Sequence, residues 1–397
     1  MFSLEQAQNR LLESIPHLGC EEISPAHAWG RVLAADVIAP LSLPPFDNSA
    51  MDGFAVRSQD VIHASPSTPV TLRELGVIAA GDTPSLQVHP GTCVRLFTGA
   101  PLPLGADAVV MQEDTCQGNN AIHVLDPVKP WENVRFQGED IRAGQTCLSS
   151  GRRLDSTALG LIAGFGLEKV TVHRRPRITL LATGEELREA GHPLLPGQIY
   201  ESNRLMIASI LEAVGAVCHI APVVPDNLAA TQNALLDAFA TSDAVVTSGG
   251  VSVGERDHVK AAFAQISGEL DLWKVAIKPG KPFAFGRFQN KLLFGLPGNP
   301  VSAFVTCMIL VRPAILQYQR ARQVHLPQFD AVAGERFENR GDRRHFVRVR
   351  FDDHRKVVSS GTQASHFMSS LATAEGLIDL APQSTVEQGE SLRVSVF

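Results

Sequence analysis

Alternating strand-type and helix-type patterns fill the middle of the chain, between about residues 175 and 320. The apolar run Ile178–Ala182 is typical of a buried strand, and the apolar positions from Leu205 to Val214 recur three and four residues apart, as in an amphipathic helix. The order repeats, with strands predicted at Ala216–Val224, Ala244–Thr247 and Leu292–Leu296, and helices at Asn227–Ala240, from near Asp257, and at about Pro300–Gln319. This βα order predicts a doubly wound parallel sheet.

The segments on either side of this region are predicted to be rich in strands. Short β-type runs separated by Pro and Gly occur at Val70–Leu72, Cys93–Phe97, Ala108–Met111 and Ala121–Leu125, within a region from about Glu21 to Arg174. After Leu326 short alternating runs return, at His345–Phe351 and Leu392–Phe397, and predict a small β domain. At the N-terminus an amphipathic helix is expected from Phe2, Leu4, Leu11, Leu12 and Ile15.

Composition excludes several classes of protein. A chain of 397 residues predicts two to four domains, and 44% hydrophobic with 19% charged residues is typical of a folded chain. Lys plus Arg number 35 against 41 Asp plus Glu, so the net charge of −6 does not favour a general nucleic-acid binder. The apolar run Val301–Val311 is shorter than the roughly 20 residues that cross a bilayer. With no basic leader ahead of an apolar block, we expect a cytoplasmic protein without a membrane span.

Cysteine usage suggests neither disulfides nor a zinc finger. The six cysteines lie far apart, with no C-x-x-C pair and no His at finger spacing. They are expected to be reduced and mostly buried: Cys20, Cys93, Cys116, Cys147, Cys218 and Cys307.

Candidate chemistry lies in the loops that follow the predicted strands, because open parallel sheets bind ligands beyond the carboxyl ends of their strands. Four such loops are expected to converge on one edge of the sheet. They are Thr183–Glu186, Pro225–Asp226, Ser248–Asp257 and Gly295–Pro300.

The third of these loops is rich in glycine and serine. Gly249, Gly250 and Gly254 would let a ligand approach the backbone and leave N–H groups for an anion, with Ser248 and Ser252 between them. A phosphate cradle and an ordinary Gly-rich turn are equally compatible with this pattern. The loop lacks the G-K-[ST] ending of a Walker A motif, which disfavours a P-loop ATPase.

Carboxylates gather at the same predicted edge. Asp226 and Asp257 each open a predicted helix, where N-capping is the ordinary role of Asp. Together with Glu185 and Glu186, however, they would repel one another unless a cation lay between them. That arrangement favours a divalent metal held by oxygen ligands.

Basic residues offer anion-binding candidates. Lys274 and Lys278 share a face if their segment is extended, and prolines on both sides of Gly280 would hold Lys281 close by. In the C-terminal region Arg348 and Arg350 alternate with apolar residues, as in a paired-Arg anion surface or a solvated sheet face. Acidic and basic groups in one site suit a polyanionic substrate presented with a cation.

Seven ordered strings, spread over nearly the whole chain, go beyond such patterns. They are P-P-F-D-N-S-A-M-D-G-F-A-V (44–56), F-T-G-A-P-L-P-L-G-A-D-A-V-V (97–110), Q-G-E-D-I (137–141), A-T-G-E-E-L (182–187), S-G-G-V-S-V-G-E-R-D (248–257), K-P-G-K-P-F-A-F-G (278–286) and G-L-P-G-N-P-V-S (295–302). Together they closely resemble the MoeA family of molybdopterin molybdenumtransferases, whose eukaryotic relative is the E domain of gephyrin.

The resemblance implies an activity and an architecture. The activity is the last step of molybdenum cofactor biosynthesis, in which adenylylated molybdopterin and molybdate react, molybdenum is placed on the dithiolene sulfurs and AMP is released. The family uses Mg²⁺ and forms an elongated homodimer. The implied domains are a discontinuous N-terminal domain (1–45 and 141–174), an inserted β-rich domain (46–140), a MogA-like α/β domain (175–322) and a C-terminal β-barrel (326–397).

The resemblance also implies site residues. Asp52, Thr98, Asp140 and Glu186 match the catalytic positions, and Asp226 and Asp257 would hold Mg²⁺ on the phosphates. Lys274 and Lys278 would bind molybdate or the anionic groups of the substrate. Further substrate contacts are expected from the matched strings and the C-terminal region: Ser248, Gly249, Gly250, Ser252, Lys281, Pro297, Pro300, Arg344, Arg348 and Ser365. Because these positions lie in both halves of the chain, a shared site is expected to need two subunits.

Two other functions are weighed against this one. A MogA-like adenylyltransferase would make adenylylated molybdopterin from molybdopterin and ATP, and a gephyrin-like scaffold would cluster a partner. Retention of the full set of carboxylates and lysines speaks against a purely structural role. The expected partners are a MogA-like adenylyltransferase and proteins of molybdoenzyme maturation.

Overall fold

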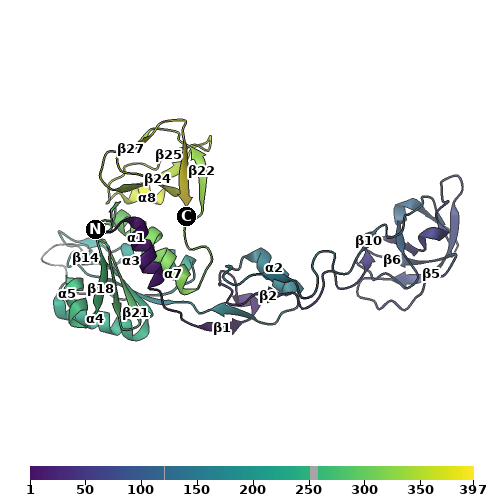
Figure 1. Cartoon of the computed structure of the whole chain (residues 1–397), viewed down its shortest axis with the longest axis horizontal. Helices are drawn as coiled ribbons and strands as arrows, with labels where there is room; N and C mark the ends of the chain where they lie inside the picture. The colour runs from purple at the N-terminus through teal and green to yellow at the C-terminus, as the bar shows by residue number, and fades with distance from the viewer. Residues whose placement is uncertain (120, 251–257) are drawn as a thin grey trace. The chain divides into compact units, whose positions relative to one another are not determined.

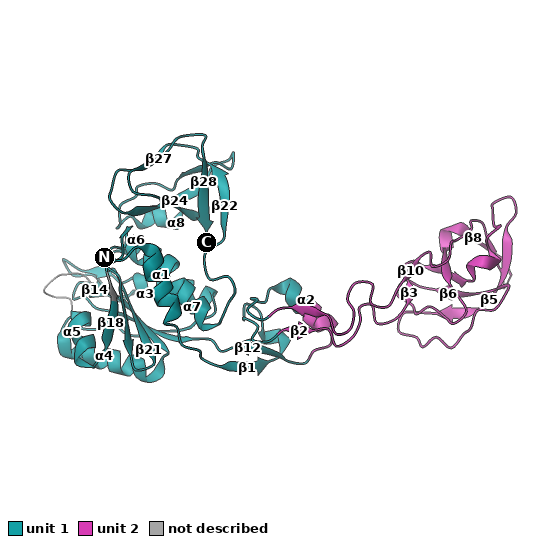
Figure 2. Cartoon of the chain, viewed as in Figure 1, with its two compact units in different colours: residues 1–35, 150–160, 168–397 teal, residues 36–149, 161–167 magenta. Residues whose placement is uncertain are grey.

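The chain divides into two compact units, each described here by itself. The computed structural model describes residues 1–119, 121–250 and 258–397. Unit 1 comprises residues 1–35, 150–160 and 168–397, and unit 2 comprises residues 36–149 and 161–167 (Figures 1 and 2). This division does not test the four domains expected from the sequence.

A six-stranded mixed sheet forms the centre of unit 1. Its strand order is β16-β13-β17-β21-β20-β18, in which the first four strands are parallel and the last two are antiparallel to their neighbours. The predicted parallel sheet is therefore confirmed, but the antiparallel edge was not expected. The strands are β13 (Arg177–Ala182), β16 (Val217–Ile220), β17 (Ala244–Ser248), β18 (Glu269–Trp273), β20 (Ala284–Phe288) and β21 (Lys291–Leu296).

Helices cover both faces of this sheet because its strands are apolar on both sides. On β17, Val245 packs with α4 and α5, whereas its neighbour Val246 packs in the cluster that contains α3 and α6. Successive strand residues point to opposite faces, so a continuous apolar strand needs two helical layers (Figure 1). The helices are α3 (Asn203–Ala213), α4 (Leu228–Thr241), α5 (His258–Gln265), α6 (Pro300–Thr306) and α7 (Arg312–Tyr318).

The longest apolar helix runs through the core of unit 1. A π-helical segment, Cys307–Val311, joins α6 to α7. Among the described residues this helix, Pro300–Tyr318, is the one long and apolar enough to cross a membrane by length and composition, and 89% of it is buried in the protein. Such burial is typical of a core helix.

The N-terminal helix expected from the sequence is α1 (Leu4–Glu13). Ser3 and Gln6 form a capping box at its start, and Leu4, Ala7 and Leu11 are buried against the central core. After it, β1 (Cys20–Ile23) pairs antiparallel with β12 (Val170–His173). The helix α2 (Ser156–Gly164) spans the division between the units.

The C-terminal region of unit 1 forms a second sheet, in the order β19-β24-β26-β28-β22, with β25 beside β24. The alternating run that predicted a strand is confirmed in β24 (Arg344–Phe351). This strand path has two ends, so the barrel stays a prediction. The other elements are β19 (Ile277–Lys278), β22 (Gln328–Val332), β23 (Phe337–Asn339), β25 (Val357–Ser359), α8 (Met368–Ala372), β26 (Gly376–Leu380), β27 (Ser384–Val386) and β28 (Ser391–Val396).

Unit 2 is built on a six-stranded sheet in the order β7-β4-β6-β5-β9-β8, with two small two-stranded sheets, as its short β-type runs predicted. Its two apolar clusters lie on opposite faces, since Phe54 and Val56 belong to one and Ala55 to the other. The strands are β2 (Val37–Ile38), β3 (Asn48–Ser49), β4 (Gly53–Val56), β5 (Val70–Ile78), β6 (Thr92–Leu96), β7 (Ala108–Met111), β8 (Thr115–Gln117), β9 (Ala121–Val124), β10 (Val134–Arg135) and β11 (Thr146–Leu148).

The cysteines differ from the expectation in their burial. All six are free thiols, but only Cys93 and Cys307 are buried, and Cys20 and Cys116 are exposed. Spacing along the sequence carries no information on which face of a short strand meets solvent, so the prediction that most cysteines are buried was wrong.

Candidate functional site

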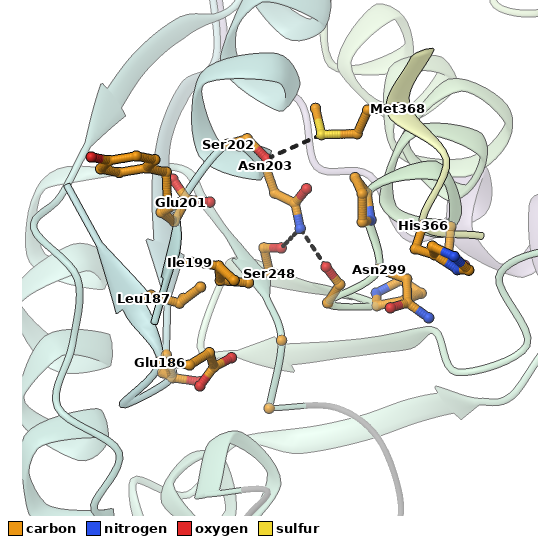
Figure 3. A pocket seen from close by; sticks show the side chains of 18 of the residues that line it. Glu186, Leu187, Ile199, Glu201, Ser202, Asn203, Ser248, Asn299, His366 and Met368 are labelled. Carbon is orange, nitrogen blue, oxygen red and sulfur yellow. Dashed lines mark hydrogen bonds between the residues drawn. The ribbon is translucent and has the colours of Figure 1, made fainter. Parts of the chain in front are cut away.

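The carboxyl ends of β13, β17 and β21 open onto a cavity of about 630 Å³ in unit 1 (Figure 3). Three of the four loops singled out in the sequence line it, because parallel strands bring their carboxyl ends to one edge. The expected site residues in its lining are Glu186, Ser248, Gly249, Gly250, Pro297 and Pro300. Ser252 and Asp257 lie outside the described residues.

Asn203, the first residue of α3, joins two of these loops. Its side-chain amide donates hydrogen bonds to Oγ of Ser248 at 2.8 Å and to the carbonyl oxygen of Gly298 at 2.7 Å (Figure 3). The side chain is buried, and its Oδ1 has no hydrogen-bond partner among the described residues. A buried acceptor without a partner is costly, so this oxygen is available to a ligand donor.

Two helices begin at the cavity. Asn203 opens α3, and Asn299 and Pro300 open α6, so both helix N-termini lie at the cavity. No Lys or Arg is among the described residues of the lining, and the helix termini therefore supply the positive potential for an anion there.

Ser365 is held against the start of α6. Its Oγ accepts a hydrogen bond from Nδ2 of Asn299 at 3.1 Å, and its carbonyl accepts one from the amide of Val301 at 3.2 Å. These bonds bring the following residue, His366, into the cavity lining. The C-terminal sheet region thus contributes to the edge of this site.

The glycine loop departs in one respect from the proposed cradle. The N–H of Gly249 donates to the carbonyl oxygen of Leu296 at 3.1 Å rather than facing a ligand. At Gly250, where φ is +68°, a Cβ would lie 2.4 Å from Cγ2 of Val259. Glycine is required there for both conformation and space.

The expected carboxylate cluster is split between two cavities. Glu186 lines the cavity described above, whereas Glu185 and Asp226 line a neighbouring cavity of about 930 Å³. Consecutive residues of the T-G-E-E loop therefore line different cavities, which the sequence pattern did not predict.

A network of ion pairs around Arg204 lies at the first turn of α3, next to the cavity. Arg204 is buried and donates to Glu201 at 2.9 Å and to Glu189 at 2.8 Å. Burial lowers the pKa of Arg204, but its hydrogen bonds to both glutamates outweigh that effect and raise it. The same hydrogen bond lowers the pKa of Glu189. Glu201, whose side chain is 6% exposed, also accepts from the amide of Arg204 and so anchors the first turn of α3.

The three lysines are not in the lining of this cavity. Lys274 has a left-handed backbone with φ of +72°, so the segment is not one continuous strand, and the extended conformation that would put Lys274 and Lys278 on one face is not present. Lys278 is exposed on β19, opposite His345 of β24. Lys281 is exposed one residue before Pro282, which does line the cavity.

Two of the three arginines of β24, Arg344 and Arg348, have protein partners, whereas the third, Arg350, is exposed. Arg344 forms ion pairs with Glu5 and Asp379. Arg348 is fully buried, and its guanidinium donates to the carbonyl of Thr362 at 2.7 Å and to Oγ of Ser370 at 3.1 Å. The expected solvated face or paired-Arg surface is therefore wrong for Arg348, because this strand is covered on the side where its arginine points.

Three expected catalytic residues lie in unit 2. Oδ1 of Asp52 accepts hydrogen bonds from the amide and the hydroxyl of Thr98, at 2.7 and 2.8 Å. These two bonds lower the pKa of Asp52. Asp140 is exposed and lies in a turn. Its own backbone amide donates a hydrogen bond to the carbonyl oxygen of Leu43. Within unit 2, the structure thus pairs two of the three residues.

Three family models match the chain in order. The MoeA N-terminal region (domains I and II) matches residues 2–166, a probable molybdopterin binding domain matches residues 179–317, and the MoeA C-terminal region (domain IV) matches residues 330–397. The chain belongs to the MoeA family.

Relatives of known name cover the same length. The molybdopterin molybdenumtransferase of Haemophilus influenzae is 38% identical, with 100% of this chain and 99% of the relative covered. Molybdopterin molybdenumtransferase 2 of Mycobacterium tuberculosis is 37% identical over 100% and 99% of the two chains. The crystal structure of the MoeA protein of Pyrococcus horikoshii OT3 matches with a TM-score of 0.87 at 27% identity, over 100% of both chains.

Several lining residues were not predicted from the sequence. Tyr200 comes from β15 (Ile199–Tyr200), which pairs with β14 (Leu187–Arg188), Ser202 and Asn203 come from the start of α3, and Met368 comes from the start of α8. A polar pair, Ser202 and Asn203, directly before a helical pattern was the available signal. These two residues do not directly follow a predicted strand, so the rule that ligands bind beyond the carboxyl ends of strands does not select them.

Proposed function

We propose that this MoeA family member catalyses the final step of molybdenum cofactor biosynthesis. In this step adenylylated molybdopterin and molybdate react, molybdenum is inserted and AMP is released. The observation that carries the proposal is the cavity at the ends of β13, β17 and β21, which lies in the segment that matches the molybdopterin-binding domain. Its helix N-termini, buried amide and carboxylate suit a ligand with phosphates and hydrogen-bonding ring edges.

The role proposed for the site residues is to position the substrate and the attacking water. Water attacks the phosphoanhydride, the P–O bond to the leaving group breaks, and AMP departs with its phosphate. Glu186 is an exposed carboxylate of the lining and would orient that water. Asn203 joins the loops of Ser248 and Gly298 by hydrogen bonds and would hold them around the substrate. Asp52, Thr98 and Asp140 are proposed to act in the same reaction.

Magnesium is proposed as the cofactor, and the donors present fit it. Mg²⁺ prefers hard oxygen ligands, and the cavity offers the carboxylate of Glu186 with the hydroxyls of Thr183 and Ser248. Asp226 in the neighbouring cavity, and Asp257 outside the described residues, would be further ligands. When bound, the ion would neutralise negative charge on the phosphates.

Anion binding and assembly complete the proposal. Lys274, Lys278 and Lys281 would bind molybdate or the substrate's anionic groups, with Ser365 at the edge of the cavity. We further propose that the protein works as a homodimer in the cytoplasm, receives its substrate from an adenylyltransferase and passes the cofactor to maturing molybdoenzymes.

The alternative functions are less well supported. An adenylyltransferase of the MogA type would need only the central α/β region, whereas the named molybdenumtransferases match this chain over its full length. A scaffold would not need the carboxylate and amide that line the cavity.

The test is AMP release by the full-length protein from adenylylated molybdopterin, with and without molybdate and Mg²⁺. We expect release to depend on both. Glu186→Gln is expected to slow release by about 100-fold or more, on the order of 3 kcal/mol, while Glu185→Gln, whose side chain lines the other cavity, is the matched control and changes it little. No release under any condition, or equal loss in both variants, would overturn the proposal.

A further inference from the structure

Two histidines and a cysteine come together where β1 meets β12. One ligand atom from each of His17, Cys20 and His173 lies within 4.8 Å of the other two. Cys20 and His173 are register partners across the two strands, with 3.7 Å between Sγ and Nδ1. His17, in the turn before β1, places its ring edge-to-face against that of His173, with centroids 5.6 Å apart.

The separation between Cys20 and His173 matches the ligand shell of tetrahedral zinc. With a Zn–S bond of about 2.3 Å and a Zn–N bond of about 2.1 Å at the tetrahedral angle, the sulfur and nitrogen lie about 3.6 Å apart. The observed separation for Cys20 and His173 is 3.7 Å. The ligand atom of His17 lies within 4.8 Å of the other two, and the hydrogen bond that its Nδ1 accepts from the amide of Gly19 is long at 3.3 Å. A small rotation of that ring therefore costs little.

The backbone around the cluster is already fixed. Nε of Arg174 donates to the carbonyl of Leu18 at 3.2 Å, which holds the turn between His17 and Cys20. Nη2 of Arg31 donates to the carbonyl of His173 at 2.8 Å, which holds the end of β12. Hydrogen bonds that fix the segments carrying the ligands help to orient those ligands before a metal binds.

Two cationic neighbours of the cluster are each paired with a carboxylate, which weakens their repulsion of a metal. Arg31 forms an ion pair with Glu21 at 2.5 Å, and Arg174 forms one with Asp243 at 2.7 Å. The cluster itself can supply a thiolate, which adds negative charge at the site. A soft sulfur with two imidazoles selects zinc over magnesium.

We propose that His17, Cys20 and His173 bind Zn²⁺ with three protein ligands, leaving the fourth position to water because His17 and Cys20 are exposed. None of the three residues lines the cavity assigned to the reaction. Bound zinc would cross-link β1 to β12, strands that stand 153 residues apart at Cys20 and His173. Its role would be to stabilise this strand pair.

The experiment is zinc binding to the full-length protein, measured in competition with a chromophoric chelator. We expect about one zinc per chain. His17→Ala and Cys20→Ser are each expected to weaken binding by about 100-fold or more, since even the loss of a group that only orients a ligand costs about 10–100-fold. The matched controls are His27→Ala and Cys116→Ser, which alter an exposed histidine and an exposed cysteine elsewhere in the chain. Both controls should bind zinc like the unaltered protein.

Two further readouts identify the ligands and do not depend on activity. Cobalt(II) should give a thiolate charge-transfer band that Cys20→Ser abolishes, and zinc should protect Cys20 but not Cys116 from alkylation. Because His17 and Cys20 are exposed, their variants are expected to fold normally, which circular dichroism checks. Absence of stoichiometric zinc, or equal binding by the variants and the controls, would overturn the proposal.

Discussion

At the scale of single residues, Asn203 shows how one carboxamide can organise a binding edge. Asn203 is the first residue of α3, and its side chain links the end of β17 to the loop after β21. In both of these hydrogen bonds its Nδ2 group is the donor. The acceptor oxygens that it satisfies are Oγ of Ser248 and the carbonyl of Gly298. A side chain of the same shape as asparagine but without the two N–H donors should therefore show how much these hydrogen bonds contribute to stability and binding.

Asn203→Asp is such a replacement. It removes two hydrogen bonds and places a negative charge beside a carbonyl oxygen and the proposed anion, so we expect unfolding free energy to fall by about 2–3 kcal/mol and substrate affinity to fall at least about 10-fold. Urea denaturation and equilibrium binding of adenylylated molybdopterin measure the two effects. Asn233→Asp, on the exposed side of α4, is the control. Unchanged stability and affinity would show that the amide has neither role.

His345 predicts a pH effect on stability. Burial, together with Lys278, Arg348 and Arg343, lowers the pKa of His345 to about 4, so the folded protein keeps this ring neutral. An unfolded chain would bind a proton near pH 6.5. Between about pH 6.5 and 4 the unfolded state therefore binds more protons, and stability falls as pH falls, by at most about 1.4 kcal/mol per pH unit.

The measurement is the free energy of unfolding of the unaltered protein and of His345→Gln across this pH window. We expect the difference between the two to shrink or reverse as pH falls, because glutamine does not titrate. His27→Gln, at an exposed histidine, should follow the unaltered protein. Parallel curves for all three proteins would contradict the assignment to His345.

At the scale of elements, the loop after β17 depends on its contact with the helix that follows. A Cβ at Gly250 would meet Cγ2 of Val259, a buried residue of α5, at 2.4 Å, and the backbone there is left-handed. Gly250→Ala therefore combines a backbone cost of about 1–2 kcal/mol with an overpacking cost of about 1–3 kcal/mol.

A double-mutant cycle separates these two costs. Val259→Ala removes the clashing methyl, so in the double variant Gly250→Ala should cost at least about 1 kcal/mol less than it costs alone. The remaining cost is the backbone strain. Stability from denaturant titration, with AMP release as a second readout, gives the four corners of the cycle. If the stability costs of the two substitutions simply add, the loop moves away from α5 when a side chain is added at Gly250.

The helices and strands could be predicted from the sequence where a single local pattern of apolar residues determines the element. The strands β13, β17 and β21 are apolar on both faces, and that alone indicates a parallel sheet between helical layers. The edge strands β18 and β20 were not predicted. Gly286, where a Cβ would clash, interrupts the apolar pattern of β20, and the register of β18 shifts between Leu270 and Leu272. The left-handed turn at Lys274 was also beyond prediction, since nothing in its own residue type requires that conformation.

At the scale of the whole molecule, sequence reasoning located the site better than it located the contacts within it. Motifs identified the loops at the ends of three strands, but not that Glu185 and Glu186 face different cavities or that Arg348 is buried. The proposed zinc ligands show the same limit. His17 and Cys20 stand three positions apart, and their partner His173 is found only through strand pairing.

The last prediction concerns residues that lie in different units. Asp52 belongs to unit 2 and Glu186 to unit 1, and both are proposed to act in one reaction of a homodimer. If each site takes Asp52 from one subunit and Glu186 from the other, a heterodimer of Asp52→Asn and Glu186→Gln holds one site with both defects and one intact site. Each variant alone should be inactive.

Mixing the two inactive variants through unfolding and refolding should then restore about a quarter of unaltered AMP release, because about half of the dimers are mixed and each has one intact site of two. Light scattering establishes that dimers are present. Refolding each variant alone is the control and should restore nothing. If the dimers mix but no activity returns, both residues serve a site within a single chain, and the two-subunit proposal is wrong.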